Sequence, residues 1–275
     1  MRGEFNSAKA VHEVVPNLVP KPIAWGTLSQ DVNIHFILCV FHGTNHQSIS
    51  AIHFAESVAK LHQKSAAPDN KFGFSITTHI GTLAQNNART TSWEAYFSIN
   101  FSQLLHLEKA IQRSDNLELE NLSNAMLTKV IPRLLRPLET DGRSVIPVLL
   151  HGDISYNNLS ASLKTKRPIV FDSAAFYGHN EYDLRNVALG LPGIEFLEVY
   201  NETIPVSDPK EDFQDRMVLY GLRDYLHESC LHPGDKIFRE QLVAGMKVLV
   251  EKFPGGYEAW LEMVEGFKTM MEDEI

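Results

Sequence analysis

Two apolar runs that each end in an aspartate constrain the fold of this chain more than any other feature of its sequence. The first run leads into His151, Gly152 and Asp153, and the second, "PIVFD", ends at Asp172. Short apolar runs bounded by turn residues are typical of buried strands. Asn158 follows Asp153 in the segment after the first run. The pattern predicts two strands that deliver two carboxylates and one carboxamide to nearby loops.

This set of side chains suits phosphoryl transfer. That reaction needs a carboxylate that accepts the proton of the attacking hydroxyl, and hard oxygen ligands for magnesium on the nucleotide phosphates. Protein kinases meet the need with H-R-D-x-x-x-x-N followed by a metal-binding aspartate. On this pattern Asp153 would be the catalytic base, and Asn158 and Asp172 would bind magnesium. The alternative is that all three are ordinary turn residues, because H-G-D-x-x-x-x-N alone is a weak pattern.

Charge and cysteine content exclude several other classes of function. The formal net charge of −9 disfavours binding to nucleic acid or to an anionic membrane surface. No apolar run is long enough to span a membrane, and no secretory signal is visible. Cys39 and Cys230 match no zinc or redox spacing, so we expect two buried free thiols in a cytoplasmic protein. The oligomeric state is left open.

The order of the expected elements predicts an α+β fold of the protein-kinase type. A helix over residues 1–12 precedes two strands, "PKPIAWGT" and "NIHFILCVFH", joined by a hairpin turn. A further helix should begin at "SDPKEDF", with Asp208 as its N-cap and Glu211 completing a capping box. Apolar periodicity predicts other helices over residues 51–65, 93–107, 119–135, 238–252 and 256–272. We therefore expect a partial, strand-rich N-lobe over residues 1–43 and a mainly helical C-lobe over 44–275.

Several phrases around the motif resemble the fructosamine kinase family, and in particular its fungal protein-ribulosamine or ketosamine 3-kinases. They are "FYGHNEYDL", "KFGF", "PKPIAWGT" and "VIPRLLRPLETDGRSVIPVLLHGD", and the resemblance covers about residues 3–257. It implies a kinase-like fold shared with aminoglycoside and choline kinases. It also implies ATP- and magnesium-dependent phosphorylation of the 3-hydroxyl of ketosamines on lysine. The phosphorylated linkage then falls apart, which repairs glycated protein.

The same resemblance implies roles for further residues. Glu4 corresponds to the helix glutamate that pairs with a phosphate-binding lysine, and His62 also lies at a family-like position, although a packing or capping role is the simpler interpretation. The strand that would run into the hinge and meet adenine contains Cys39, Val40 and Phe41. The candidates for the sugar or amine pocket are Gln85, Asn87, His179 and Glu181. For these four, turn-forming or solvated surface residues are the alternative.

The chain also departs from the family pattern. No G-x-G-x-x-G motif or lysine-bearing strand precedes Glu4, and Ile154 and Ser155 replace the usual Leu-Trp. Asn157 replaces a glycine, and Ala84 replaces a proline. These departures leave three hypotheses: a ketosamine kinase, a non-catalytic kinase-like protein that binds a partner or sugar amine, and a kinase for another hydroxylated amine such as choline or an aminoglycoside.

Overall fold

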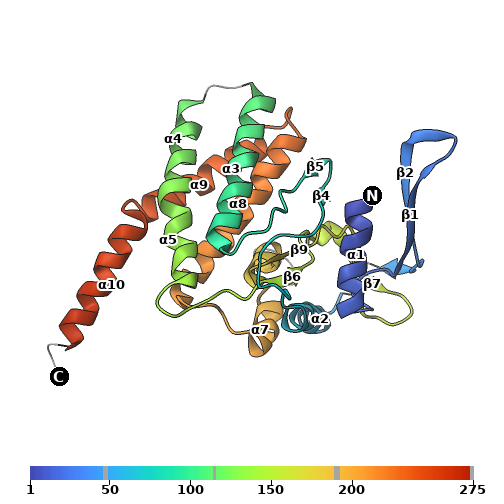
Figure 1. The fold of residues 1–275 in the computed structure, drawn as a ribbon, viewed down its shortest axis with the longest axis horizontal. Helices are drawn as coiled ribbons and strands as arrows, with labels where there is room; N and C mark the ends of the chain where they lie inside the picture. Colours follow the sequence, from blue (N-terminus) through green and yellow to red (C-terminus); the bar gives the residue numbers. More distant parts are fainter. Residues whose placement is uncertain (46–48, 114–115, 189–192, 273–275) are drawn as a thin grey trace. The chain divides into compact units, whose positions relative to one another are not determined.

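The computed structural model describes residues 1–45, 49–113, 116–188 and 193–272 (Figure 1). The chain divides into two compact units. The first unit comprises residues 1–96 and 146–206, and the second comprises 97–145 and 207–275. Residue 43, where we expect the lobe boundary, lies within the first unit, so that boundary stays a prediction.

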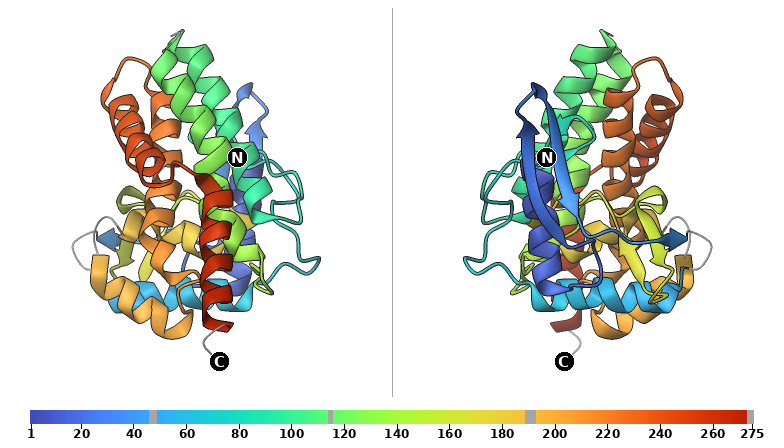
Figure 2. Two further views of the ribbon diagram at one scale, coloured as in Figure 1. Left: turned by 90° about the vertical axis from the view of Figure 1, so that its left-hand side faces the viewer. Right: turned by 90° about the vertical axis from the view of Figure 1, so that its right-hand side faces the viewer.

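The first unit begins with the helix and hairpin that the sequence predicts. Helix α1 covers Arg2–Val14, strand β1 covers Pro22–Leu28, and strand β2 covers Asp31–Cys39. The two strands pair antiparallel and form a sheet of their own (Figures 1 and 2). Because β2 has most of its side chains exposed, Cys39 is only partly buried, and the expectation of a buried thiol is wrong there; Cys230 is buried as expected.

Helices α2 and α7 pack against each other in the first unit. Helix α2 covers Ala51–Lys64, close to the predicted range, and Ser50 caps it by accepting a hydrogen bond from the backbone N–H of His53. Helix α7 covers Gly193–Thr203. The rings of Phe54 and Phe196 lie 5.0 Å apart across this contact. Short helical segments over Asn180–Leu184 and Arg185–Ala188 (α6) lead toward α7.

Both apolar runs form strands, but the two strands do not pair with each other. The first run is β6, Val148–Leu150, which pairs antiparallel with β9, Phe176–Gly178. The second is β8, Pro168–Val170, which pairs with β7, Leu159–Ser162. The sheet order is β3-β7-β8, where β3 covers Thr44–Asn45. A hairpin of β4, His79–Ile80, and β5, Leu83–Ala84, completes the strands described in this unit.

The second unit is helical. Helix α3, Trp93–Gln112, enters it, and α4, Leu117–Ala125, continues through a π turn over Met126–Val130 into α5, Ile131–Leu135. The other helices are α8, Phe213–Leu231, α9, Ile237–Lys252, and α10, Gly256–Glu272. These elements confirm the predicted helical segments. The core of this unit includes Phe97, Phe101, Leu134, Tyr220 and Met246.

The predicted capping box at the start of α8 is wrong. A 3-10 turn over Lys210–Asp212 precedes α8, and in the described chain no side-chain hydrogen bond caps either element. Asp212 instead binds Arg133, with Nη1 to Oδ2 at 2.6 Å and Nη2 to Oδ1 at 3.0 Å. A buried arginine that donates two hydrogen bonds orders this segment more strongly than a solvent-exposed cap would.

No helix within the described ranges is long and apolar enough to cross a membrane.

Candidate functional site

The turn after β6 places Asp153 against the segment that follows Asp172. Gly152 has a φ of +86°, and a Cβ at this position would clash with the carbonyl oxygen of Ala174. The N–H of Ala174 donates to the carbonyl of His151 at 3.0 Å. Glycine is therefore required between His151 and Asp153, because a larger residue would push the two segments apart.

A buried aspartate, Asp183, stabilises this turn through hydrogen bonds to its backbone. Its carboxylate accepts hydrogen bonds from the backbone N–H of His151 at 2.7 Å and of Gly152 at 2.9 Å. The Nε2 atom of His62 lies 3.3 Å from the same carboxylate, and the other ring nitrogen bonds the hydroxyl of Tyr200 at 2.7 Å. Burial by itself raises the pKa of Asp183, but the His62 hydrogen bond and nearby positive charge lower it overall.

Asp183 is a residue that the motif analysis missed. Its position inside the distinctive "NEYDL" phrase was the available signal, because a charged residue within an otherwise buried segment needs a specific partner. Its hydrogen-bond partners His151 and His62 are 32 and 121 residues away in sequence. Contacts between segments so far apart leave no local pattern in the sequence.

Asn158 connects Asp153 to the end of β8. Its Nδ2 donates to the Asp153 carboxylate at 2.8 Å and to the Asp153 carbonyl at 3.0 Å. The N–H of Phe171 donates to the carbonyl of Asn158 at 2.8 Å. Asp172 follows directly and has a φ of +57°, a conformation that costs energy for a residue other than glycine and is concentrated at functional sites. The three motif residues therefore lie in one hydrogen-bonded neighbourhood.

Asp153 and Asp172 line one cavity of about 430 Å³ within the first unit. Glu4 of α1 is a third carboxylate in its wall. Its full lining is Met1, Glu4, His79, Ile80, Gly81, Asp153, Asp172 and Ser173. Because this described lining contains no lysine or arginine, the cavity favours cations or ligands that carry a cation.

Helix α1 places Glu4 in this wall through two close contacts. Gly3 packs against the backbone of Thr77, where a Cβ would lie 2.5 Å from the carbonyl oxygen. The Ser7 hydroxyl accepts a hydrogen bond from the N–H of Ala175 at 3.0 Å. Burial, and then the charge of Asp172, raise the pKa of Glu4 above its ordinary value. Among the residues that the structure describes, neither Glu4 nor Asp172 has a side-chain hydrogen bond or ion pair.

The donor set is suited to a metal that also binds a nucleotide. No cluster of three or more His, Cys, Asp or Glu side chains that could hold a metal occurs in the described part of the chain. A magnesium ion commonly uses one or two carboxylates and completes its coordination with water and phosphate oxygens. Asp172 provides one such carboxylate, and Asn158 is linked to the residue before it by the hydrogen bond from the N–H of Phe171. The residues present therefore fit magnesium bound together with a phosphate ligand.

Asn158 and the other predicted site residues are not part of the described lining of this cavity. Gln85 donates to the carbonyl of Ala174 at 2.9 Å, and Asn87 donates to the Thr78 hydroxyl at 2.7 Å, so both buried amides bind the protein itself. His179 and Glu181 are each 1% exposed. The strand end formed by Cys39, Val40 and Phe41 is partly to fully exposed. None of these seven residues belongs to the described lining, whereas His79, Ile80 and Gly81, which the sequence analysis missed, do.

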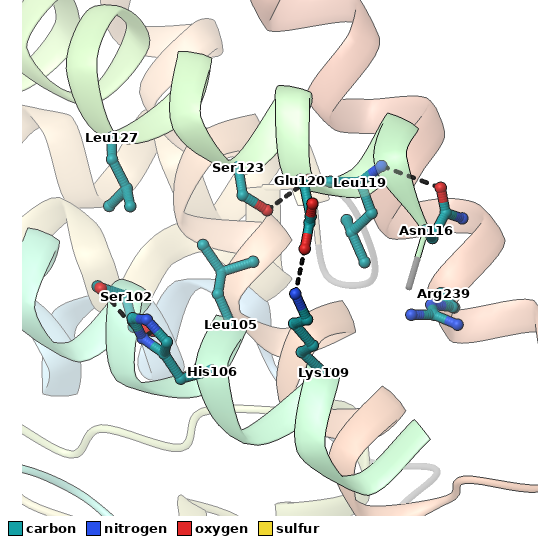
Figure 3. A pocket seen from close by; sticks show the side chains of 10 residues that line it. All are labelled: Ser102, Leu105, His106, Lys109, Asn116, Leu119, Glu120, Ser123, Leu127 and Arg239. Atoms are coloured by element: carbon teal, nitrogen blue, oxygen red, sulfur yellow. Dashed lines mark hydrogen bonds and ion pairs between the residues drawn. The ribbon is translucent and has the colours of Figure 1, made fainter. Parts of the chain in front are cut away.

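A second cavity, of about 220 Å³, lies among α3, α4 and α9 in the second unit (Figure 3). Its apolar lining is Leu105, Leu119 and Leu127. Lys109 on α3 pairs with Glu120 on α4 beside these leucines. Arg239 on α9 lies 2.9 Å from the buried carboxylate of Glu108. The cavity contains none of the predicted site residues, and these charged side chains are neutralised within the protein.

Comparison with known sequences yields a family match. The family described as "Fructosamine kinase" matches residues 1–249. The mouse protein named ketosamine-3-kinase is 33% identical over 159 residues, which is 58% of this chain and 48% of the mouse protein. The chain therefore spans about half the length of that relative.

Comparison with solved structures shows the fold. A candidate fructosamine-3-kinase from Haemophilus somnus superposes with a TM-score of 0.71 at 21% identity, covering 90% of this chain and 79% of the other. A thermostable mutant of the aminoglycoside phosphotransferase APH(4)-Ia superposes with a TM-score of 0.59 at 15% identity, covering 91% and 83%. The predicted α+β, kinase-like fold is thus confirmed.

Proposed function

The chain belongs to the fructosamine kinase family, and on this premise we propose that it phosphorylates the 3-hydroxyl of ketosamines, using ATP and magnesium. The substrates would be ribulosamine or fructosamine adducts on free or protein-bound lysine, and loss of the phosphorylated sugar would repair the glycated amine. Family membership supports the reaction class, and the name of the mouse relative supports the substrate class. One observation carries the proposal: Asp153, Asp172 and Glu4 line the same cavity.

Asp153 is the catalytic base of the proposed reaction. It would accept the proton of the 3-hydroxyl while that oxygen attacks the terminal phosphorus of ATP and ADP leaves with the bonding electrons. The hydrogen bond from Asn158 Nδ2 at 2.8 Å orients the carboxylate. Gly152 and Asp183 are positioning residues, because they fix the backbone on which Asp153 sits.

Asp172 and Asn158 would hold the magnesium ion. Carboxylate and carboxamide oxygens are hard donors of the type that magnesium prefers. With Nδ2 of Asn158 bonded to Asp153, its Oδ1 has no hydrogen-bond partner in the described residues and is available to a cation. When bound, the metal would offset negative charge on the transferring phosphates.

The nucleotide would bind between the partial N-lobe, residues 1–43, and the C-lobe, residues 44–275. Glu4 would face its phosphates, and the backbone at Cys39, Val40 and Phe41 would meet the adenine, as the family resemblance implies. The carboxylates of Glu4, Asp153 and Asp172 repel a bare triphosphate, so nucleotide binding should depend on magnesium.

The four candidates for the sugar or amine pocket would act indirectly, by shaping the wall of the cavity. They are Gln85, Asn87, His179 and Glu181. Gln85 and Asn87 fix Thr78 and Ala174, which flank two segments of the cavity wall. His179 and Glu181 are buried next to the segment that contains Asp183. We propose that these four residues shape the wall that the ketosamine contacts, and that His79 on the rim contributes directly.

A non-catalytic kinase-like binding protein is the second candidate function. The observation that favours it is Glu4, for which the described structure holds no lysine or arginine partner of the kind that positions phosphates in kinases. Such a protein would bind a sugar amine or a nucleotide without phosphate transfer. A kinase for choline or an aminoglycoside would share the fold and metal site and would differ in substrate.

Phosphate transfer to a substrate panel separates these functions. The chain would be incubated with ATP and magnesium and with lysine fructosamine, lysine ribulosamine, choline or kanamycin, and products would be followed by phosphorus NMR and mass spectrometry. We expect a 3-phosphate on a ketosamine and none on the other two compounds, with chelation of magnesium as the control. Nucleotide binding by a folded chain that phosphorylates none of them would support the second candidate instead.

A further inference from the structure

The backbone on either side of Asp153 is stabilised mainly by side chains, because it lies beyond the strand pairing of β6. Strand β6 ends at Leu150, and residues 151–154 follow it. A buried backbone N–H or C=O group without a hydrogen-bond partner costs free energy, so these residues need partners from elsewhere. Several of the partners come from residues 183–186. Asp183 accepts hydrogen bonds from N–H groups of this turn, and the residues after it donate to the carbonyl groups.

Arg185 binds the carbonyl group just before Asp153. Its Nη2 donates to the carbonyl of Gly152 at 3.3 Å, and its Nη1 donates to the carbonyl of Tyr182 at 2.8 Å. The guanidinium lies over the ring of Tyr182, with Cζ 4.1 Å from the ring centroid, and the side chain is fully buried. Burial of an arginine is costly unless its charge and its donors have partners. Arg185 therefore links the segment that contains Asp183 to the residue before the proposed base.

Asn186 binds the carbonyl group just after Asp153. Its Nδ2 donates to the carbonyl of Ile154 at 3.1 Å, and the Ile154 side chain is 1% exposed. The carbonyl of Asp153 itself accepts a hydrogen bond from Nδ2 of Asn158 at 3.0 Å. The carbonyl groups of residues 152–154 thus each accept a hydrogen bond from a different side chain. This arrangement restricts how the backbone can turn at Asp153.

We propose that Arg185 and Asn186 are positioning residues, which fix the backbone before and after Asp153 and thereby direct its carboxylate at the acceptor hydroxyl. This inference rests on the proposed function, because it takes Asp153 as the catalytic base. Neither residue belongs to the described cavity lining, so neither needs to contact the substrate. Displacement of a catalytic group by about 1 Å can cost about 10²-fold in rate, although the substrate still binds. Loss of either residue should therefore lower kcat and leave KM unchanged.

Substitution of Asn186 is the first test, because this side chain is only partly buried. Asn186→Leu keeps the approximate size of the side chain and removes the donor, so kcat for ketosamine phosphorylation should fall by about 10–100-fold. KM for ATP and for the ketosamine should stay within about twofold. Asn186→Gln keeps the amide donor and should retain more activity than Asn186→Leu. Arg185→Lys keeps the charge but not the paired donors, and should lower kcat with the same unchanged KM.

The matched control removes a similar hydrogen bond in the second unit. Gln112 donates from Nε2 to the carbonyl of Ser229 at 3.0 Å and is also partly buried. Gln112→Met should therefore disturb the fold about as much as Asn186→Leu, but should leave kcat within about twofold. Circular dichroism checks that each variant folds. Equal losses of kcat in Gln112→Met and Asn186→Leu would overturn the proposal, because the effect would then come from general destabilisation.

A double-mutant cycle tests whether Asn186 acts through Asp153. The Asp153→Asn chain has no base to direct, so adding Asn186→Leu to it should change the residual kcat by less than about twofold. The same fold loss in both backgrounds would mean that Asn186 acts independently of the base, and it would contradict the proposed role.

Hydrogen exchange separates failure of this inference from failure of the proposed function, because it requires no turnover. Exchange of the amides of residues 151–158, measured by mass spectrometry, should be about 3–10-fold faster in Asn186→Leu than in the unmodified chain, and unchanged in Gln112→Met. A chain that phosphorylates no ketosamine but shows this faster exchange would contradict the proposed function and support the role of Asn186 in ordering the turn. Unchanged exchange in Asn186→Leu would overturn the positioning role, whether or not the chain is active.

Discussion

Two cavities among the described residues differ in how their charges are balanced. In the cavity of the first unit, the Glu4 and Asp172 carboxylates have no ion-pair partner among the described residues. In the cavity of the second unit, Lys109 pairs with Glu120 (Figure 3). Arg239, which also lines this cavity, pairs with Glu108. Uncompensated charge costs stability, so it persists where a ligand supplies the missing partner. The comparison favours the cavity of the first unit over that of the second as the candidate ligand site.

The backbone shows the same contrast. Asp172 has a left-handed φ of +57° beside the first cavity, and Gly152 has a φ of +86° on the turn that carries Asp153. The second cavity is lined largely by residues of regular helices, of which Leu105 and Leu119 are examples. Strain collected around two carboxylates is expected of a functional site, whereas relaxed helices around a gap are expected of ordinary packing.

Removal of the proposed base should have the largest effect. Asp153→Asn keeps the shape of the side chain but removes its ability to accept a proton, so kcat for ketosamine phosphorylation should fall by about 10²–10⁴-fold. Glu120→Gln, the corresponding change at the second cavity, should leave kcat within about twofold. Equal losses in both variants, measured by coupled ADP release, would remove the distinction between the two cavities.

Buried His151, two residues before Asp153, should make the free energy of unfolding decrease at acidic pH. Burial lowers the pKa of His151 to about 4, despite the opposing charge of Asp183, and its Nε2 has no hydrogen-bond partner in the described structure. The unfolded chain takes up this proton below about pH 6.5, but the folded chain does so only near pH 4. Stability should therefore fall by about 3 kcal/mol between those values on account of this one group.

Urea denaturation at pH 7 and pH 4.5 measures this loss by comparison with His151→Gln. The variant should lose less stability between the two pH values than the unmodified chain, because other titrating groups contribute equally to both. Identical pH dependence would mean that His151 is not held neutral by burial.

Loss of the proposed metal ligand should have an intermediate effect. Asp172→Asn removes the charged oxygen donor, and the magnesium concentration that gives half-maximal turnover should rise by about 10–100-fold. The control is Asp215→Asn, which removes a carboxylate that pairs with Lys252 in the second unit and should leave the magnesium requirement unchanged. An unaltered requirement in Asp172→Asn would place the metal elsewhere.

The paired charges of the second cavity should matter least. Lys109→Met with Glu120→Gln removes a largely exposed ion pair, so the free energy of unfolding should change by less than about 1 kcal/mol. Nucleotide binding should not change. A substantial loss of nucleotide binding in this double variant would show that the second cavity is part of the functional site.

Local patterns in the sequence predict much of this fold and part of this site. The helices and the β1–β2 hairpin follow from apolar periodicity and turn residues. The H-G-D-x-x-x-x-N spacing singles out Asp153 and Asn158, and in the structure a 2.8 Å hydrogen bond joins their side chains. The functional roles of these residues stay predictions, because the geometry alone does not test them.

Contacts between distant segments could not be predicted in the same way. Strand β6 pairs with β9, and Asp183 accepts a hydrogen bond from the backbone of the H-G-D turn. In both contacts, neither segment has a sequence pattern that identifies the other as its partner. The start of α8 differs from its predicted capping box because Arg133, far away in sequence, binds Asp212. Tertiary hydrogen bonds of buried charged groups outweigh local capping preferences in such places.

Calorimetric titration of the chain with ATP is the most direct test of the claim that the first cavity binds a metal–nucleotide ligand. We expect saturable binding in the presence of magnesium, and its loss when magnesium is chelated or when Asp172→Asn is used. Binding of equal strength without magnesium, or no binding by a chain shown to be folded, would contradict the account.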